Sequence, residues 1–308
     1  LATLPRLTDT NGCGSVSETL PETVSETLPE TVPETVRGYP RRAFLICLVA
    51  YTTAQMDLAL FGYAVPAIRA EFDLTLSEVM AIVSIAFLIG GGLLVALGWL
   101  GDRIGRLPMF QFSLLGSSIL VALISVAPGV IALTVLRGAS IAVGGLSYPI
   151  TGAIVTEEMP ARLRGLFMGL LQIGYPLGWA LASLWSMWLL TRYGWRPLFL
   201  VGLISLPLVW VVRHYLREPA RAQAAKAEQA PAVLSDLWAP DIRERAATLF
   251  LAQFLFVWAY AASIFLFPSF LRDVRGLDAF NFSLLIGAGN GIGVLGYVLA
   301  AWIGERVW

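Results

Sequence analysis

A short charged segment separates two long apolar runs in the first half of the chain, and it reads Gly98-Trp99-Leu100-Gly101-Asp102-Arg103-Ile104-Gly105-Arg106. The apolar run before it extends from Val79 to Leu97, and the run after it extends from Pro108 to Ala127. Each run has about the 20 residues that an α-helix needs to cross the hydrocarbon core of a bilayer. The segment therefore predicts two membrane helices joined by a compact polar turn.

The composition of the whole chain is that of a membrane protein. Apolar residues make up 57% of the sequence and charged residues only 14%, whereas soluble domains carry roughly 25% charged residues. The mean hydropathy is +0.74. The formal net charge is zero, which argues against nucleic acid as a partner.

The few residues suited to metal binding or covalent catalysis are scattered. The two cysteines, Cys13 and Cys47, are too few for a disulfide framework, and the one histidine, His214, forms no metal-ligand motif with them. The apolar runs contain no Ser–His or Cys–His set. We therefore expect neither an enzyme nor a bound cofactor or metal.

Eight apolar runs are candidates for membrane spans. They cover residues 43–67, 79–100, 108–127, 130–155, 166–190, 196–212, 247–268 and 281–303. Backbone groups within lipid must bond to one another, and the runs lack the period-two alternation of barrel strands, so we expect helices. With the N-terminus in the cytoplasm, most arginines fall in cytoplasmic segments, as the positive-inside rule requires. The prediction is an all-α, multi-pass protein of the bacterial cytoplasmic (inner) membrane.

Composition also divides the chain into four parts. Residues 1–42 form a polar tail whose residues 17–36 are the tetrapeptides SETL, PETV, SETL, PETV and PETV; repeated proline predicts disorder here. Residues 43–212 hold the first six spans, and residues 247–308 hold the last two. Between them, residues 213–246 form a loop rich in Ala, Glu and Arg.

The end of the chain repeats part of the charged turn. It reads Ala301-Trp302-Ile303-Gly304-Glu305-Arg306-Val307-Trp308. Trp, Gly and Arg stand here at the same spacing as in residues 98–105, and Glu replaces Asp. Repetition of a multi-helix unit is how many secondary transporters are built. We therefore expect that the last helices of the second unit are missing and that these residues do not transport alone.

The charged turn resembles the loop 2–3 signature G-x-L-a-D-R-x-G-R of the major facilitator superfamily, whose members are secondary transporters. The resemblance implies a major facilitator fold with a complete N-terminal six-helix bundle and the first two helices of the C-terminal bundle. The chain would then contain about eight of twelve helices. The segment from Glu157 to Gly165 resembles the superfamily motif E-x-x-P-x-x-x-R-G, which implies that Glu157 pairs with Arg103 or Arg106.

These two motifs predict a cytoplasmic gate. Gly98 and Gly101 would let a facing helix approach closely, and a carboxylate at Asp102 suits a helix N-terminus. Charge pairs that form in one transporter state and break in the other would open and close the path. The residues assigned to this gate are Gly98, Asp102, Arg103, Gly105, Arg106, Glu157 and Arg164. The alternative is a polar turn that obeys the positive-inside rule and has no switching role.

Two charges lie within the apolar runs. Asp57 stands near the middle of the first span, where a charge needs a partner or a water-filled cavity. Arg137 stands in the fourth span at a depth within about 4 Å of Asp57. An Asp that exchanges a proton beside an Arg that binds an anion would make a minimal coupling device, since Arg binds carboxylates with two parallel hydrogen bonds. The alternative is a static buried ion pair.

A narrower resemblance indicates the substrate class. The run from Asp57 to Ile68 resembles the first helix of aromatic-acid and related metabolite:proton symporters, and the run from Gly169 to Trp179 resembles the G-Y-x-L-G segment of organic-acid symporters. These resemblances imply proton-coupled uptake of a small organic anion by a monomeric protein in the lipid bilayer. The further residues expected along the pathway are Gln172, Tyr175, Asn290 and Tyr260.

Two alternatives stay open on sequence grounds. A sugar or polyol porter of the same superfamily can carry a similar Asp–Arg pair. A membrane receptor on the same fold would bind a ligand without moving it across the membrane. Competition between carboxylates and sugars would distinguish the first alternative, and flux measurements would distinguish the second.

Overall fold

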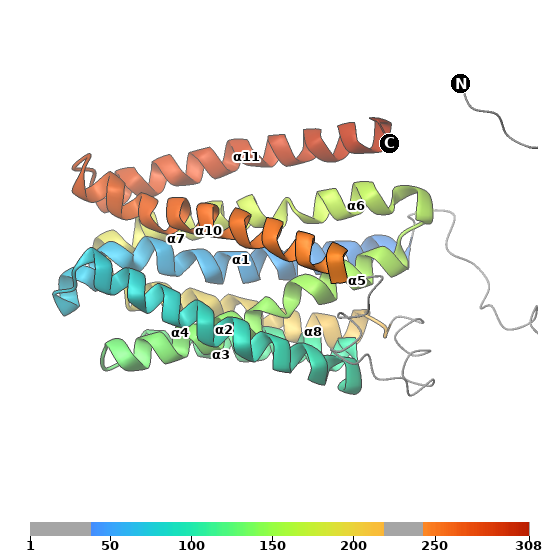
Figure 1. Ribbon diagram of the computed structural model, residues 1–308, viewed down its shortest axis with the longest axis horizontal. Helices are drawn as coiled ribbons and strands as arrows, with labels where there is room; N and C mark the ends of the chain where they lie inside the picture. Colours follow the sequence, from blue (N-terminus) through green and yellow to red (C-terminus); the bar gives the residue numbers. More distant parts are fainter. Residues whose placement is uncertain (1–37, 219–242, 308) are drawn as a thin grey trace, which may run out of the picture. The chain divides into compact units, whose positions relative to one another are not determined.

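The computed structural model describes residues 38–218 and 243–307, and every regular element within them is helical (Figure 1). The tail predicted over residues 1–42 and the loop predicted over residues 213–246 lie largely outside the described residues. The elements are α1 (Tyr39–Phe72), α2 (Leu76–Ile104), α3 (Arg106–Ile124), α4 (Val130–Gly145), α5 (Ser147–Glu158), η2 (Ala161–Leu163), α6 (Arg164–Leu171), α7 (Gly174–Tyr193), η3 (Pro197–Ser205), α8 (Leu206–Tyr215), α10 (Arg243–Asp273) and α11 (Ala279–Val307).

The all-α membrane fold predicted from hydropathy is confirmed. Seven segments among the residues searched are long and apolar enough to cross a membrane. They coincide with the first six predicted spans and with the last one. The remaining predicted span, 247–268, lies within α10.

Three of the predicted spans are not continuous α-helices, and a proline accounts for each interruption because it has no N–H to donate to the carbonyl four residues earlier. Pro149 follows the break between α4 and α5, and α4 ends at Gly145. Pro176 cannot donate to the carbonyl of Gln172, and this carbonyl accepts instead from the backbone N–H of Tyr175 at 3.0 Å. In the sixth span the 3₁₀ segment η3 changes to α8 just before Pro207.

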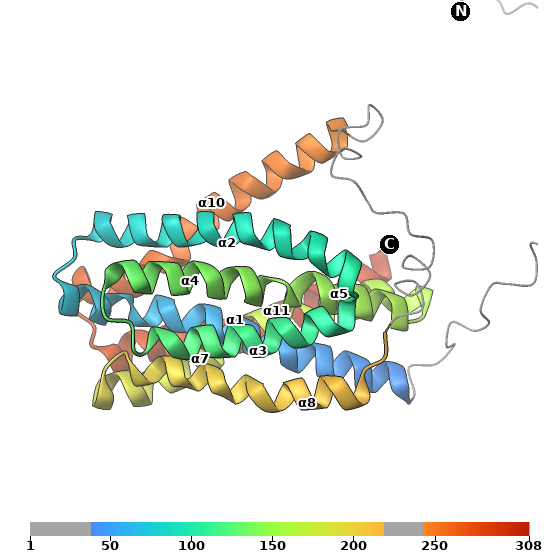
Figure 2. The same cartoon turned by 90° about the horizontal axis from the view of Figure 1, so that it is seen from below.

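The central helix of the first six spans is α1. It packs against α7, α5, η3 and α8 within these spans and also against α10, while α2 packs against α4, and α11 against α6 and α7. Figures 1 and 2 show these helices running alongside one another, with the first half of α10 diverging from its neighbours.

Two apolar clusters surround different stretches of α1. One contains residues from Met56 to Ile68 together with Phe199, and the other contains residues from Ala43 to Tyr51 together with Phe110. Between them α1 carries Thr52, Thr53 and Gln55, and the buried Asp57 follows directly after Met56. The polar part of α1 therefore lies where the two clusters meet.

The contact between α1 and α7 depends on a glycine. A Cβ atom on Gly178 would lie 2.6 Å from the backbone oxygen of Thr52 and 2.7 Å from the backbone nitrogen of Met56. Such distances are too short for any side chain, so only glycine lets the two backbones approach this closely. This contact holds α7 against the polar part of α1. It also holds there the interruption between α6 and α7.

Candidate functional site

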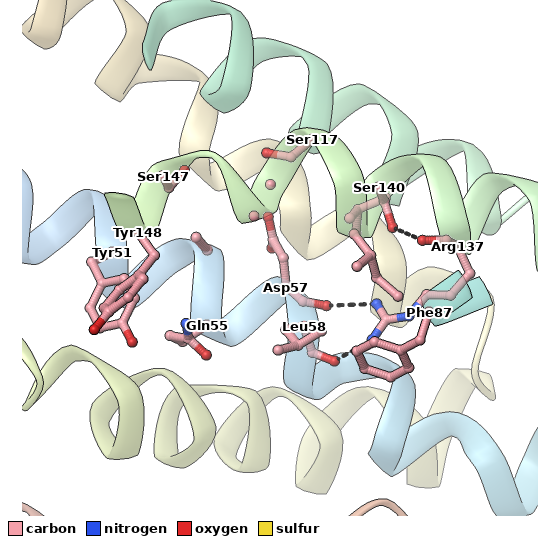
Figure 3. Close-up of a pocket in the computed structure, with 15 residues that line it drawn as sticks. Tyr51, Gln55, Asp57, Leu58, Phe87, Ser117, Arg137, Ser140, Ser147 and Tyr148 are labelled. Carbon is pink, nitrogen blue, oxygen red and sulfur yellow. Dashed lines mark hydrogen bonds between the residues drawn. The ribbon is translucent and has the colours of Figure 1, made fainter. Parts of the chain in front are cut away.

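A cavity of about 120 Å³ lies inside the first group of spans, at the polar part of α1 (Figure 3). Side chains and backbone from α1 to α5 form its walls. The lining residues are Tyr51, Ala54, Gln55, Asp57, Leu58, Phe87, Ser117, Val121, Arg137, Ser140, Ile141, Gly144, Gly145, Ser147 and Tyr148. Both charges predicted within the apolar runs therefore face one cavity. The break between α4 and α5 also borders it, as expected where irregular backbone lines a polar space in a membrane protein.

Arg137 holds α4 against α1. Its side chain is only 3% exposed, and its guanidinium donates to the backbone carbonyl of Leu58 at 2.7 Å and to that of Asp57 at 3.5 Å. The guanidinium carbon also lies 4.7 Å from the ring centroid of Phe61, a cation–π contact. The positive charge is thus stabilised by carbonyl dipoles and a ring face.

The carboxylate of Asp57 points away from this guanidinium, toward Ser117 on α3 (Figure 3). Asp57 is 4% exposed, and among the described residues neither of its carboxylate oxygens has a hydrogen-bond partner. One of them lies 3.4 Å from the position that a Cβ on Gly202 would occupy. An ionised carboxylate in such a place costs several kcal/mol unless it is paired, and a protonated one avoids that cost.

Asp57 and Arg137 therefore lie close to each other, as predicted, but they do not contact each other through their charged groups. The two residues share a cavity, yet within the described residues they form no ion pair, so a static Asp57–Arg137 ion pair is the wrong description of this state. The physical reason is that the guanidinium bonds to backbone carbonyls of α1, while the Asp57 side chain leaves α1 on the side of α3.

The polar cluster at the other end of the cavity includes two tyrosines that sequence reasoning missed. Tyr51 donates to Oε1 of Gln172 at 3.2 Å, and Nε2 of Gln172 donates to the hydroxyl of Tyr148 at 2.9 Å. The two tyrosine rings lie 5.5 Å apart, centroid to centroid. For Tyr51, one feature of the sequence could have indicated a place at the site: it lies less than two helical turns before Asp57 on the first span.

Two of the other predicted pathway residues, Tyr175 and Asn290, have contacts elsewhere in the described structure. The Tyr175 ring packs against Trp179, with 5.9 Å between ring centroids. The Asn290 amide donates to the backbone oxygen of Ile286, one turn earlier on α11, at 2.9 Å. The side chain of Tyr260 lies outside the described residues.

The predicted gate residues lie near the ends of α2 and α5 and at the beginnings of α3 and α6. Arg106, not Arg103, forms the ion pair with Glu157, while the Arg103 guanidinium lies over the Trp99 ring at 3.7 Å. Arg164 donates through Nε to the backbone oxygen of Met159 at 3.2 Å. The ion pair of Glu157 that the two motifs imply is thus present, and Arg106 is the arginine that forms it.

The turn between α2 and α3 also shows a contact that was not predicted. The Glu218 carboxylate accepts from the backbone N–H of Arg106 at 2.8 Å and of Leu107 at 2.9 Å. These donors open α3 and lack partners within the helix, so a carboxylate stabilises them and the positive end of the helix dipole. Gly105 makes the turn possible with a φ of +115°, which residues with side chains rarely adopt.

The two glycines predicted to allow close helix packing, Gly98 and Gly101, differ in their surroundings. A Cβ on Gly98 would have nothing within 4 Å among the described residues, so the predicted close approach of a facing helix is absent there. A Cβ on Gly101 would lie 3.4 Å from Met109, a neighbour on α3. The side chain of Asp102 lies outside the described residues.

Comparison with known proteins assigns this architecture to a family. Residues 47–308 match the Major Facilitator Superfamily. The chain is 27% identical over 283 residues to a cis,cis-muconate transport protein of Acinetobacter baylyi, covering 86% of this chain and 66% of that protein. It is 28% identical over 183 residues to a 4-hydroxybenzoate transporter of the same organism, covering 58% of this chain and 39% of that protein.

A solved structure has a similar fold. It is the crystal structure of a bacterial homologue of the human lysosomal transporter Spinster in an inward-facing, unoccupied conformation, with a TM-score of 0.63 and 17% identity, covering 86% of this chain and 61% of that one. The chain thus spans about two thirds or less of the length of these relatives. Because the family match covers most of the chain, this protein belongs to the Major Facilitator Superfamily.

Proposed function

We propose that these residues belong to a carrier that takes up a small organic anion, a carboxylate, together with protons and by alternating access. The observation that carries the proposal is the cavity in which a buried carboxyl group, Asp57, and a buried guanidinium group, Arg137, lie within one membrane bundle. The names of the muconate and 4-hydroxybenzoate relatives support a carboxylate as substrate.

In this proposal Arg137 attracts the substrate carboxylate and Asp57 carries the coupled proton. The guanidinium keeps its charge, so it can exchange a backbone carbonyl for a carboxylate, which is the stronger acceptor. Within the part of the chain that the structure describes, no hydrogen-bond donor holds the Asp57 carboxylate in its ionised form. Gln172, Tyr175, Asn290 and Tyr260 remain proposed pathway residues.

The gate and the topology are part of the same proposal. The N-terminus and the Arg106–Glu157 pair would lie on the cytoplasmic side of a bacterial inner membrane. Residues 43–212 would form the first bundle of a monomeric carrier, and residues 247–308 would begin the second. The gate would open when the carboxylates of Glu157 and Glu218 release the start of α3.

The decisive experiment is Asp57→Asn in cells or proteoliposomes that contain the complete product of the gene encoding this chain. We expect the variant to lose accumulation of labelled benzoate driven by an inward proton gradient, while exchange of benzoate across the membrane continues. Asp73→Asn is the matched control, because Asp73 is an exposed carboxyl group just after α1 and its φ of 50° suits Asn.

Undiminished gradient-driven accumulation in the Asp57→Asn variant would remove this residue from the coupling role. Inhibition of uptake by sugars and not by carboxylates would replace the anion proposal with a sugar or polyol porter. Ligand binding without any flux would replace transport with a receptor function.

A further inference from the structure

The cluster of Tyr51, Gln172 and Tyr148 is a second polar feature of the cavity, separate from the two charges. Figure 3 shows the two tyrosines at one end of the cavity and Arg137 at the other, with Asp57 between them. A substrate whose carboxylate approached Arg137 would therefore direct its opposite end toward the tyrosines.

The fold places Gln172 at this end for a local reason. Pro176 interrupts the fifth span, so Gln172 and Ile173 lie between α6 and α7 rather than within a continuous helix. The tight contact at Gly178 holds this break against α1. The amide of Gln172 thereby reaches tyrosines from two other elements, α1 and α5, and joins three spans.

The direction of the hydrogen bonds determines what this cluster offers a ligand. Tyr51 donates to the Gln172 oxygen, and the Gln172 nitrogen donates to the Tyr148 oxygen. The Tyr148 hydroxyl is an acceptor in this chain, so its own proton is left to donate elsewhere. Tyr148 is 45% exposed and lines the cavity. Bonds that run in one direction polarise one another, which strengthens the terminal donor.

We propose that Tyr51, Gln172 and Tyr148 form a subsite for an oxygen acceptor at the end of the substrate opposite its carboxylate. The ligand class is a carboxylate that carries a hydroxyl, a carbonyl or a second carboxylate at its far end, on a planar framework that can lie against the tyrosine rings. Two of the relatives are named as transporters of muconate and of 4-hydroxybenzoate, and both compounds have such an oxygen. The inference rests on the proposed function and adds the residues that select the substrate.

The test compares 4-hydroxybenzoate with benzoate, which lacks the distal oxygen, as competitors for uptake by the complete gene product. We expect the wild type to prefer 4-hydroxybenzoate and Tyr148→Phe to reduce this preference by about tenfold, the effect of losing one hydrogen bond of ordinary strength. The variant should lower uptake of 4-hydroxybenzoate more than uptake of benzoate, because only 4-hydroxybenzoate has the distal oxygen that accepts this hydrogen bond. Tyr193→Phe is the matched control, because Tyr193 is exposed at the end of α7, away from the cavity lining.

A second variant separates ligand recognition from a structural role. In Gln172→Glu the ionised side chain can only accept, so both tyrosine hydroxyls would donate to it. The cluster would stay connected, but the Tyr148 proton would no longer face the ligand. We expect Gln172→Glu to lose the preference as Tyr148→Phe does, and we expect a merely structural cluster to keep it.

The possible outcomes separate this inference from the proposed function. If the wild type transports both acids and neither variant changes their ratio, the subsite is wrong and the carrier proposal stands. If both variants lower uptake of the two acids equally, the cluster is structural and the subsite is also wrong. If the wild type takes up and binds neither acid, the proposed function itself fails.

Discussion

At the scale of single residues, Arg137 has a structural role as well as its proposed role in binding. Its guanidinium contacts two carbonyls of α1 and the ring of Phe61. A Lys ammonium is a compact charge that cannot reproduce these contacts together. We expect Arg137→Lys to weaken competition by benzoate and to lower the free energy of unfolding by about 1–3 kcal/mol, the cost of leaving buried polar groups unpaired.

Chemical unfolding of the purified protein in detergent measures the stability effect, and competition for uptake measures the affinity. Arg192→Lys is the matched control, because Arg192 is exposed in the last turn of α7. Equal unfolding free energies for the two variants would show that the contacts of Arg137 with α1 add nothing to stability.

The sequence predicts which residues matter here better than it predicts their contacts. Asp57 and Arg137 stand out because a charged residue in an apolar span needs a partner or a water-filled cavity. Their actual arrangement depends on a carbonyl of Leu58, and every residue has a carbonyl, so no sequence pattern marks it. Tyr148 was missed for a related reason: its proposed role depends on a hydrogen bond from Gln172, which is distant in sequence and adjacent only after folding.

At the scale of elements, hydropathy predicts where the spans lie but not how each helix is built. The prolines at 149, 176 and 207 were visible, and their effect on the helices follows from the missing N–H. Whether a proline kinks a helix or divides it depends on neighbours that bond to the freed carbonyls. At Gln172 the break has a structural consequence, because it frees a residue from the helix so that its side chain joins three spans.

The contact of α1 with α7 allows a direct test of element packing. We expect Gly178→Ala to lower the free energy of unfolding by about 1–3 kcal/mol, because the added methyl group would clash with backbone atoms that cannot move aside as a side chain can. Gly91→Ala on α2 is the matched control, since its Cβ would have nothing within 4 Å among the described residues.

Unfolding of the two variants in the same detergent gives the comparison. The Gly91→Ala protein should match or slightly exceed the wild type, because Ala favours helix more than Gly does. A Gly178→Ala protein of wild-type stability would mean that α1 and α7 separate at little cost, and that the position of Gln172 is not fixed by this contact.

At the scale of the whole molecule, α10 and α11 pack against the first six spans, and two polar contacts illustrate how they are joined. The Ser183 hydroxyl on α7 donates to the backbone oxygen of Ser283 on α11 at 2.5 Å. Arg69 on α1 forms an ion pair with Asp273 on α10. The repeat of the charged turn predicted a second bundle, but it could not predict these contacts, because they join residues that no motif contains.

The Arg69–Asp273 pair provides the test at this scale, because the proposed alternating access requires contacts between bundles to break and reform. We expect Arg69→Asp and Asp273→Arg each to lower benzoate uptake, since each places like charges together, and we expect the double exchange to restore it. With side chains 21% and 45% exposed, the pair should contribute no more than about 1 kcal/mol to stability. Uptake by the complete gene product is therefore the measurement. A double variant as impaired as the two single variants combined would show that attraction between these charges plays no part in the transport cycle.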